Sequence, residues 1–445
     1  MYRDFTHAGR RSRTGAAGRF ALAIALAGGL ALGSAAPAFA KDDPKQQKAE
    51  GNSKAFAEAY APMQKIVNDP AGNFAAAKAM IPTVQAAIQN GADKNTFGHA
   101  LIALGDKLQD IGLQKQGIQL ALESGQATPA QTGMFHYFLG KWAYGDKNYT
   151  EALTQLQAAV QAGYTDGDPE AIIADSYFGA GQNAQGLQYL QDLIQKRVAA
   201  GQQVPESFYR RGLGVAYRAK MAPQADTYAA MLVQKYPTPE NWQAALQVVN
   251  ALGQFDANGQ LDMYRLMRET GALKEPRDYF GYAVSADPMK LSHEVLAVLD
   301  QGVKSGALSA SDQNYLKLKS IADSRAADNK AAADAIADDA RKSPTGKIAI
   351  AAGDQYFSLG EYDKAAEMYQ LAVTKGGADS DLARIRLGIA QVKQGQLDAA
   401  KASFGQVTGA RAPAAKMWLA YVDSKTAPPT PPAPPAPPAP PPAGA

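Results

Sequence analysis

The chain has 445 residues, its 45 lysines and arginines nearly balance its 42 aspartates and glutamates, and it contains no cysteine. A chain of this length holds several ordinary domains, or one array of repeats whose core grows along the chain. The lack of cysteine excludes disulfides, thiolate metal sites, a thiol nucleophile and a cysteine-linked lipid anchor.

Residues 1–40 predict a cleaved export signal. Five arginines precede an apolar run over 20–32, and Ala-Phe-Ala at 38–40 has the small-x-small pattern that signal peptidase accepts. The run is shorter than the ~20 residues of a membrane span, so we expect cleavage rather than a retained anchor. Removing the five arginines and Asp4 leaves 40 basic against 41 acidic residues. Such a neutral mature chain predicts neither nucleic acid nor anionic membrane as a partner, and we expect it in the periplasm or beyond.

The polar residues 41–53 predict disorder before the first helix. From 54 to 312 the sequence favours helical hairpins, most plainly in LGKWAYGDKNYTEALTQLQAAV at 139–160. The same order of small and large residues follows around Ala174 and Leu190. A weaker copy, LGVAYRAKMAPQADTYAAMLVQKYP at 213–237, fits if its turn is about one residue short.

Residues 313–345 depart from the pattern. The stretch RAADNKAAADAIADDARK is rich in alanine and aspartate and lacks the aromatic and glycine positions of the hairpins. We interpret 313–345 as an irregular helical hairpin that links two repeat blocks, and as a candidate hinge.

Residues 346–411 predict two well-formed hairpins. In GDQYFSLGEYDKAAEMYQLAVTKG, residues at intervals of three and four share a helix face, and Gly360 can end the first helix. The small residues Gly353 and Ala365 would let the two helices approach, while Tyr369 fills the space beside them. Such a hairpin must stack on copies of itself to bury both faces, and LGIAQVKQGQLDAAKASFGQV is the next copy.

Residues 412–426 predict one more helix, which would cap the apolar end of the array with Trp418, Leu419 and Val422 turned inward. The last segment, 427–445, reads APPTPPAPPAPPAPPPAGA. Its eleven prolines favour polyproline II geometry with a reach of roughly 60 Å at ~3.1 Å per residue. This tail is a spacer or a docking segment, and no core element.

The hairpins resemble the tetratricopeptide repeat, a helix-turn-helix unit with small residues where its helices touch. The order of the units is similar to that of a group of exported alphaproteobacterial proteins with such repeats. The resemblance implies an all-α fold, namely a right-handed superhelical solenoid of helix-turn-helix repeats closed by the C-terminal helix.

The resemblance also implies a concave groove lined by the first helix of each hairpin. Four positions of that helix point at the ligand in the family. When these positions are carried over to three hairpins of this chain, the aromatic, charged and large apolar side chains among them are the predicted groove residues. They are Met134, Tyr137, Lys141, Tyr144, Asp175, Phe178, Phe208, Arg211 and Arg218. Aromatic residues together with arginine are enriched where proteins bind proteins or peptides, although tyrosine and phenylalanine also fill repeat cores.

The sequence offers no set of catalytic, metal-binding or cofactor-binding residues. The three histidines after the signal, His99, His136 and His293, form no pair at one-turn spacing. GLGVAY at 212–217 lacks a phosphate-loop lysine, and the Asp-Gly-Asp at 166–168 lacks the other ligands of a calcium loop.

The sequence therefore favours a non-enzymatic exported scaffold that binds a protein or peptide in its groove, in a cell-wall or envelope complex. The alternative is a polysaccharide-associated factor of envelope or exopolysaccharide synthesis, because Trp142 and Tyr144 could stack on sugars. Repeat scaffolds serve many functions, so the fold does not choose between them.

Overall fold

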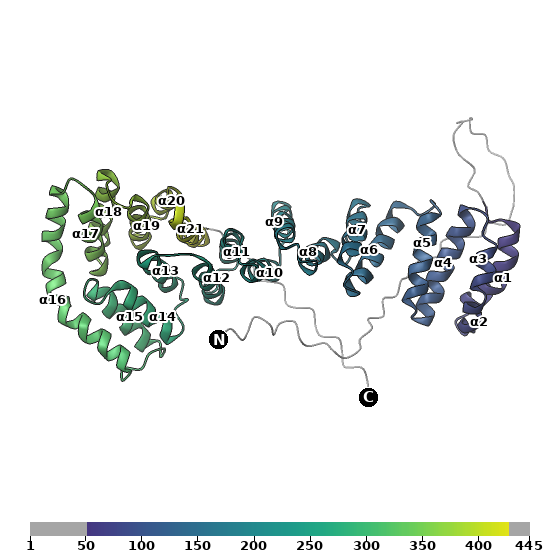
Figure 1. The fold of residues 1–445 in the computed structure, drawn as a ribbon, viewed down its shortest axis with the longest axis horizontal. Coiled ribbons are helices and arrows are strands. Elements are labelled where there is room, and N and C mark those ends of the chain that lie inside the picture. The colour runs from purple at the N-terminus through teal and green to yellow at the C-terminus, as the bar shows by residue number, and fades with distance from the viewer. Residues whose placement is uncertain (1–50, 427–445) are drawn as a thin grey trace. The chain divides into compact units, whose positions relative to one another are not determined.

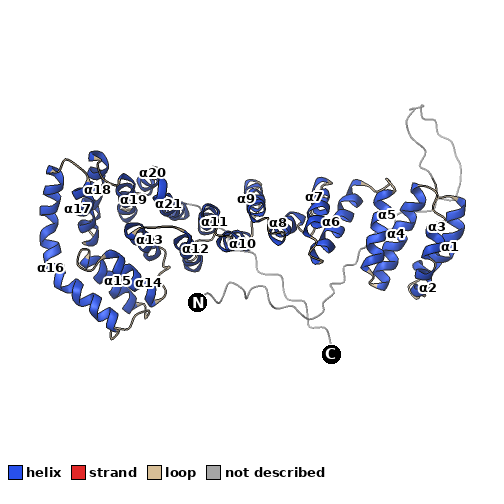
Figure 2. Cartoon of the chain, viewed as in Figure 1, coloured by secondary structure: helices blue, strands red, loops and turns tan. Residues whose placement is uncertain are grey.

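The structure is a computed structural model that describes residues 51–426, and every regular element in that range is a helix (Figure 2). The prediction of an all-α fold of helical hairpins is confirmed. The export signal, most of the polar segment 41–53 and the tail 427–445 lie outside the described residues. The chain divides into two compact units, with Tyr189 the last residue of unit 1 and Leu190 the first of unit 2.

Unit 1 consists of consecutive helices, and the boundary between the units falls within its last one. The helices are α1 (Lys54–Asn68), α2 (Phe74–Ala79), α3 (Ile81–Ala86), α4 (Gly91–Leu108), α5 (Ile111–Glu123), α6 (Pro129–Gly145), α7 (Tyr149–Gln161), α8 (Pro169–Gly179) and α9 (Asn183–Ala199). The pairs α4–α5 and α6–α7 pack as hairpins (Figure 1). Each apolar core lies between consecutive helices.

Unit 2 continues the succession of helices. It contains α10 (Glu206–Arg218), α11 (Ala222–Lys235), α12 (Pro239–Leu252), α13 (Ala257–Glu269), α14 (Pro276–Ala286), α15 (Ser292–Lys304), α16 (Gln313–Lys342), α17 (Lys347–Ser358), α18 (Tyr362–Lys375), α19 (Ser380–Lys393), α20 (Leu397–Gly405), the short 3₁₀ helix η1 (Gly409–Arg411) and α21 (Ala412–Thr426). No helix within 51–426 combines the length and the apolarity that crossing a membrane requires.

The hairpin turns share one backbone conformation, in which a residue with left-handed φ and ψ ends the first helix. Gly360 takes this role with φ of 79°, and the next N–H, of Glu361, donates to the carbonyl of Tyr356 at 2.9 Å. Lys147 and Lys220 occupy the same place in their turns with φ of 61° and 55°. The turn of the α10–α11 hairpin is therefore as long as the others, and the expected one-residue deletion is wrong.

Close contact between the helices of a hairpin depends on glycine facing a large side chain. A Cβ on Gly353 would lie 2.5 Å from the Tyr369 ring. Three further pairs have the same sequence spacing: Gly140 with Leu156, Gly212 with Tyr228, and Gly388 with Phe404. These contacts confirm the small-and-large pattern expected from the sequence, and they define the repeat register.

The segment expected to be a helical hairpin linker, 313–345, is instead dominated by one continuous helix, α16 (Figure 1). Alanine is the strongest helix former, and the range Gln313–Lys342 has neither glycine nor proline to provide a turn. Five buried residues along the helix, such as Ala322 and Ala337, allow α15 and α17 to pack against it.

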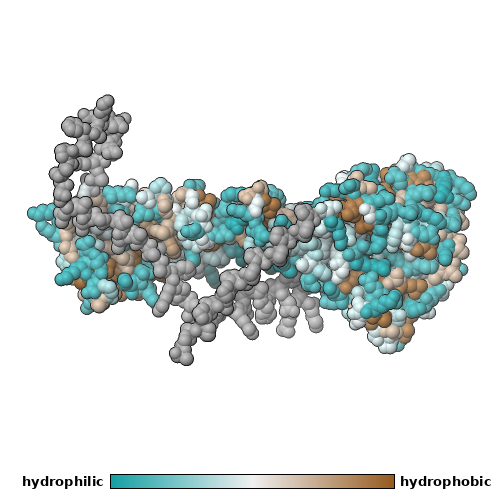
Figure 3. All heavy atoms as spheres, turned by 180° about the vertical axis from the view of Figure 1, so that it is seen from behind, coloured by the Kyte–Doolittle hydropathy of each residue, from teal (hydrophilic) through white to brown (hydrophobic). Residues whose placement is uncertain are grey.

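Unit 2 also joins helices that are distant in the sequence. Helix α21 packs against α11 and α13 as well as against its neighbour α20, and α19 packs against α13 (Figure 1). The hydrophobic residues on the surface of this unit lie in patches separated by hydrophilic ones (Figure 3). The last helices therefore close back onto the first part of the unit, an arrangement that the repeat pattern does not encode.

Candidate functional site

Helix α6 of unit 1 carries a partly exposed aromatic surface. Met134, Phe138 and Lys141 follow one another at intervals of four and three, so they share one side of the helix. The Trp142 ring lies beside Phe138, with ring centres 5.7 Å apart, and Tyr144 is also partly exposed. We call Met134, Phe138, Lys141 and Trp142 the α6 face, because Tyr144 follows Trp142 by two residues and points to another side of the helix.

Tyr137 lies beneath Lys141 rather than on the surface. It is 5% exposed, its ring centre is 5.0 Å from that of Tyr164, and its hydroxyl donates to the carbonyl of Gly167 at 3.3 Å. The ammonium of Lys141 lies 5.6 Å from the centre of the Tyr137 ring. Burial lowers the pKa of Lys141, so the α6 face presents a partly dehydrated cation that lies over one aromatic ring.

The other predicted residues of unit 1, Asp175 and Phe178, lie on α8, which contacts α6. Both are partly exposed. The Phe178 ring also covers Gly186, where a Cβ would lie 2.5 Å from the ring, so part of this side chain packs within its own hairpin. The structure thus brings the six predicted residues of unit 1 onto two adjacent helices.

The predicted residues of unit 2 lie on α10. Arg211 and Arg218 are exposed, and Phe208 is partly exposed with the guanidinium of Arg197 lying 5.1 Å from its ring centre. Matching LGVAY at 213–217 to LGKWA at 139–143 would make Gly214 the residue that touches the second helix, but the structure gives that contact to Gly212. The three side chains therefore stand two positions away from the equivalents of those on α6.

Sequence analysis missed a buried network of charged side chains in unit 2. Arg265 on α13 donates two hydrogen bonds to Glu294 on α15, at 2.9 and 2.8 Å. The Tyr282 hydroxyl donates to the same carboxylate at 2.7 Å, and the Phe357 ring centre lies 4.3 Å from the Arg265 guanidinium. Arg265 and Glu294 are 2% and 3% exposed, so this bidentate pair is a core element.

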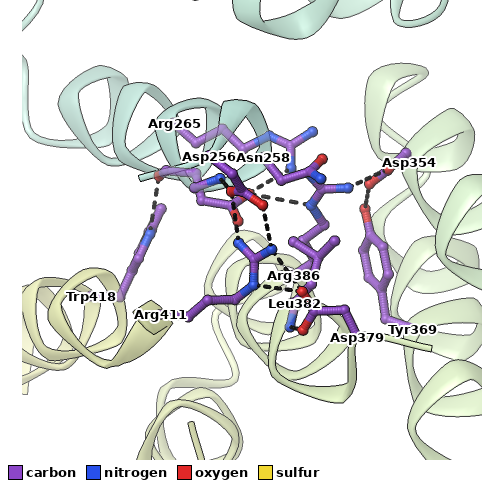
Figure 4. A network of polar contacts seen from close by, with 12 residues as sticks. Asp256, Asn258, Arg265, Asp354, Tyr369, Asp379, Leu382, Arg386, Arg411 and Trp418 are labelled. Carbon is purple, nitrogen blue, oxygen red and sulfur yellow. Dashed lines mark hydrogen bonds and ion pairs between the residues drawn. The ribbon is translucent and has the colours of Figure 1, made fainter. Parts of the chain in front are cut away.

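Arg386 on α19 extends the network to α13 and α17 (Figure 4). Its guanidinium donates to Asp262 at 3.3 Å, to Asn258 at 2.9 Å, and to Asp354. The hydroxyl of Tyr369 donates to the other oxygen of Asp354 at 2.7 Å. Arg386 thereby joins α19, α13 and α17, and its partner Asp262 lies 124 residues away in the sequence.

The two most deeply buried carboxyl groups of the network differ in pKa. Burial raises the pKa of Asp262, more than the charges of Arg386 and Arg265 lower it, and its Oδ2 has no hydrogen-bond partner among residues 51–426. Burial also acts on Glu294, but the charge and hydrogen bonds of Arg265 hold its pKa below the usual value. Because these groups are buried and directed at one another, the arrangement supports the packing of α13, α15, α17 and α19.

A surface pocket of about 270 Å³ opens at the edge of this network. Arg411 lies in it and donates to Asp256 at 2.8 Å and to Asp379 at 2.7 Å (Figure 4). The guanidinium joins these two carboxylates, and Asp381 accepts hydrogen bonds from Thr408. Within 51–426 no group of three or more histidine or acidic side chains is placed to hold a metal ion.

The contact between α11 and α21 is expected to depend on pH through Asp226. Burial raises the pKa of Asp226 to about 6, and the nearby charge of Lys416 offsets only part of this shift. An aspartate pKa above its unfolded value of ~3.9 contributes stability that is fully present below pH ~4 and is lost as the pH rises through 6. We expect Asp226→Asn to raise the free energy of unfolding by about 1 kcal/mol at pH 7.5, after allowance for its partial exposure, and by little at pH 4.5.

Urea denaturation of wild type and Asp226→Asn at these two pH values measures the effect. An equal difference in the free energy of unfolding between the two proteins at both pH values would contradict a raised pKa of Asp226.

No family model matches the chain, and no curated protein matches it. Among solved structures, it is similar to a chain of Naa15/Naa10 bound to HypK-THB, with 9% identity over 79% of this chain and 61% of that one and a TM-score of 0.26. It is similar to the TPR2AB domain of yeast Sti1 in its pHSP90 complex, with 14% identity over 66% of this chain and 98% of that one and a TM-score of 0.21. It is also similar to the TPR domain of P58(IPK), with 10% identity over 82% of this chain and 97% of that one and a TM-score of 0.22.

The chain thus spans about three fifths of the first of these structures. TM-scores this low establish neither a shared fold nor a shared activity. The helical-hairpin architecture is instead established by the helices, turns and glycine contacts described above.

Proposed function

We propose that the chain is a non-enzymatic exported scaffold whose α6 face binds a segment of a protein partner in a cell-envelope complex. The α6 face is the observation that supports this most, because the partly exposed rings of Phe138 and Trp142 lie on the same helix as Lys141, whose ammonium lies over the Tyr137 ring. Aromatic side chains at the centre of a patch are typical of protein-binding hot spots. Export and the periplasmic location rest on the predicted signal at 1–40.

The absence of an enzymatic role is part of this proposal. Three strongly buried charged groups, Arg265, Glu294 and Arg386, are directed into the core of unit 2. His136 Nδ1 lies 2.6 Å from the side-chain oxygen of Gln155, a neighbouring helix residue. Neither arrangement places a nucleophile beside a base.

Polysaccharide binding remains the competing proposal. It was based on Trp142 and Tyr144, whose nearest aromatic partners are Phe138 and Tyr149 at 5.7 and 5.9 Å. Each ring is thus paired with another ring of the protein. Retention on purified cell-wall or capsular glycan that is lost in Trp142→Ala would favour this competitor.

Site-specific photocrosslinking in cells tests the protein-binding proposal. A benzoylphenylalanine at Phe138 is expected to form adducts with a small set of envelope proteins, identified by mass spectrometry. The matched control carries the same crosslinker at Thr154, which is exposed on α7, the second helix of the same hairpin. Identical adducts at both positions, or adducts at neither, would overturn the proposal.

A further inference from the structure

Helix α10 of unit 2 turns three arginines toward solvent. Arg210, Arg211 and Arg218 are exposed and, at 3.6 residues per turn, lie within about a third of the helix circumference. The opposite side of the helix, which includes Ala216, is buried. Gly214 lies between the arginines on the exposed side. We call Arg210, Arg211, Gly214 and Arg218 the α10 face.

The hairpin of α10 and α11 is basic in a chain whose charges otherwise nearly balance (Figure 1). Residues 206–235 contain five lysines and arginines against two acidic residues. The hairpins on either side contain more acidic than basic residues, with three against two over 169–199 and four against two over 239–269. The α10 face holds three of the five basic residues of its hairpin, so it attracts negatively charged groups.

The acidic residues of the chain leave part of this charge available to a ligand. Arg210 pairs with Glu206, one turn earlier, at 2.5 Å, and both side chains are more than a third exposed. Such a surface pair is weak, so a carboxylate of a ligand can replace Glu206. Arg218 has no ion-pair partner among residues 51–426.

Gly214 is a second indication of a ligand at the centre of the face. Glycine within a helix costs stability relative to alanine, so its presence needs a reason. The close contact between the helices of this hairpin uses Gly212, where a Cβ would lie 2.1 Å from the Tyr228 ring. Near a Cβ at Gly214, the only side-chain atom among residues 51–426 is Nη1 of Arg218, at 3.3 Å. A glycine among exposed basic side chains lets the backbone of a ligand approach the helix closely.

We propose that the α10 face binds an extended acidic segment of a protein partner. The carboxylates of the segment would accept hydrogen bonds from the arginines, whose planar guanidinium groups match a carboxylate in shape. Its backbone would cross the helix at Gly214. This surface lies in unit 2 and is not the α6 face, so the inference goes beyond the proposed function and does not depend on it.

The spacing of the arginines fits such a segment. Arg211 and Arg218 are seven residues apart, which is ~10.5 Å along the helix axis at ~1.5 Å per residue. In polyproline II geometry, side chains three residues apart project from the same side of the segment at a distance of ~9.3 Å. Acidic residues separated by two others can therefore reach both arginines at once.

Other polyanions fit the α10 face less well. A protein that gains much of its affinity from DNA phosphates makes roughly 6–10 such contacts, and this face offers three arginines. A helix that lies on a membrane needs apolar side chains exposed beside its cations, and none of the strongly exposed apolar residues within 51–426 lies on α10. A short acidic segment needs neither.

Fluorescence anisotropy of a labelled peptide tests the proposal. The probe carries four glutamates separated by pairs of glycine or serine residues, and the control probe has glutamine in their place. The protein is the chain from 41 to 445, because the five arginines of the predicted export signal would themselves attract an acidic peptide. We expect the glutamate probe to bind about tenfold more tightly than the glutamine probe, and to lose roughly tenfold in affinity between about 50 and 200 mM salt.

Substitutions locate the binding surface. Arg218→Gln is expected to weaken binding of the glutamate probe about fivefold, whereas Arg277→Gln, which removes an exposed positive charge from α14 of unit 2, should weaken it less than about twofold. Gly214→Ala is also expected to weaken binding about fivefold, although alanine favours the helix and only the far end of Arg218 must move. Urea denaturation should show that Gly214→Ala is at least as stable as wild type, so unfolding does not explain its loss of binding.

Equal binding of the glutamate and glutamine probes would overturn the proposal, as would equal losses in Arg218→Gln and Arg277→Gln. Unchanged binding in Gly214→Ala would contradict the crossing of the ligand at that residue. Single-stranded DNA or phosphatidylglycerol vesicles that bind more tightly than the glutamate probe, and no longer bind to Arg218→Gln, would assign the face to another polyanion and overturn the proposal as well.

Discussion

Replacing Arg386 with alanine is expected to lower the free energy of unfolding of unit 2 by about 3–5 kcal/mol. The substitution leaves the largely buried Asp354 without its guanidinium, and it leaves the fully buried Asp262 with Arg265, at 3.3 Å, as its remaining guanidinium partner. A carboxylate left without its cation in a dry core keeps its desolvation cost and loses the compensating attraction. Urea denaturation followed by far-ultraviolet circular dichroism measures the loss.

Lys393→Ala is the matched control for Arg386→Ala. Lys393 also joins α19 to α13, through an ion pair with Glu269 at 2.7 Å, but both side chains are between 21% and 27% exposed. Solvent screening limits such a pair to about 1 kcal/mol or less. Equal losses in the two variants would show that burial of the network does not set its contribution.

Replacing Trp418 with alanine is expected to cost a similar amount, about 3–5 kcal/mol. The indole is 0% exposed, stacks on Phe404 with ring centres 5.8 Å apart, and donates from Nε1 to the carbonyl of Asp262 at 3.2 Å. Alanine would leave a cavity between α13, α20 and α21 and an unpaired carbonyl. We therefore expect α21 to become accessible to limited proteolysis as well as a lower urea midpoint.

Two neighbouring variants separate the contributions of Trp418. Trp418→Phe keeps a ring against Phe404 but removes the indole donor, and should lose about 1–2 kcal/mol. Leu419→Ala alters the adjacent, partly exposed residue of α21 and should lose less than the alanine variant at 418. A loss in Leu419→Ala as large as in Trp418→Ala would contradict a specific role for the indole.

The missed network had a sequence signal of moderate strength. Asp262 and Arg265 are three residues apart on α13, and the buried Leu261 and Leu266 stand beside them in the sequence. Charged residues at positions where a helix periodicity expects apolar ones indicate a buried pair. Their partners could not be inferred, because Arg386 lies 124 residues from Asp262 and nothing local records that distance.

The predicted groove residues show in which hairpins the ligand-facing positions of the repeat family can be assigned from the sequence. On α6 the assignment depended on Gly140, which the structure places against Leu156, and Met134 and Lys141 do share one side of the helix. On α10 two glycines, Gly212 and Gly214, were available as the contact residue, and periodicity could not choose between them. The aromatic face that includes Phe138 and Trp142 was missed as a unit because the family positions skip Phe138.

Local features of the sequence were sufficient for the helices, their turns and the small-and-large contacts within each hairpin. These depend on residues three, four or a few more positions apart, and on glycines such as Gly360 whose backbone conformation few other residues adopt readily. The single helix α16 was wrongly predicted as a hairpin, although its alanines and its lack of glycine and proline were local signals for one continuous helix. The closure of α19 and α21 onto α13 was not, because it depends on shape and charge complementarity between surfaces that exist only after the hairpins have stacked.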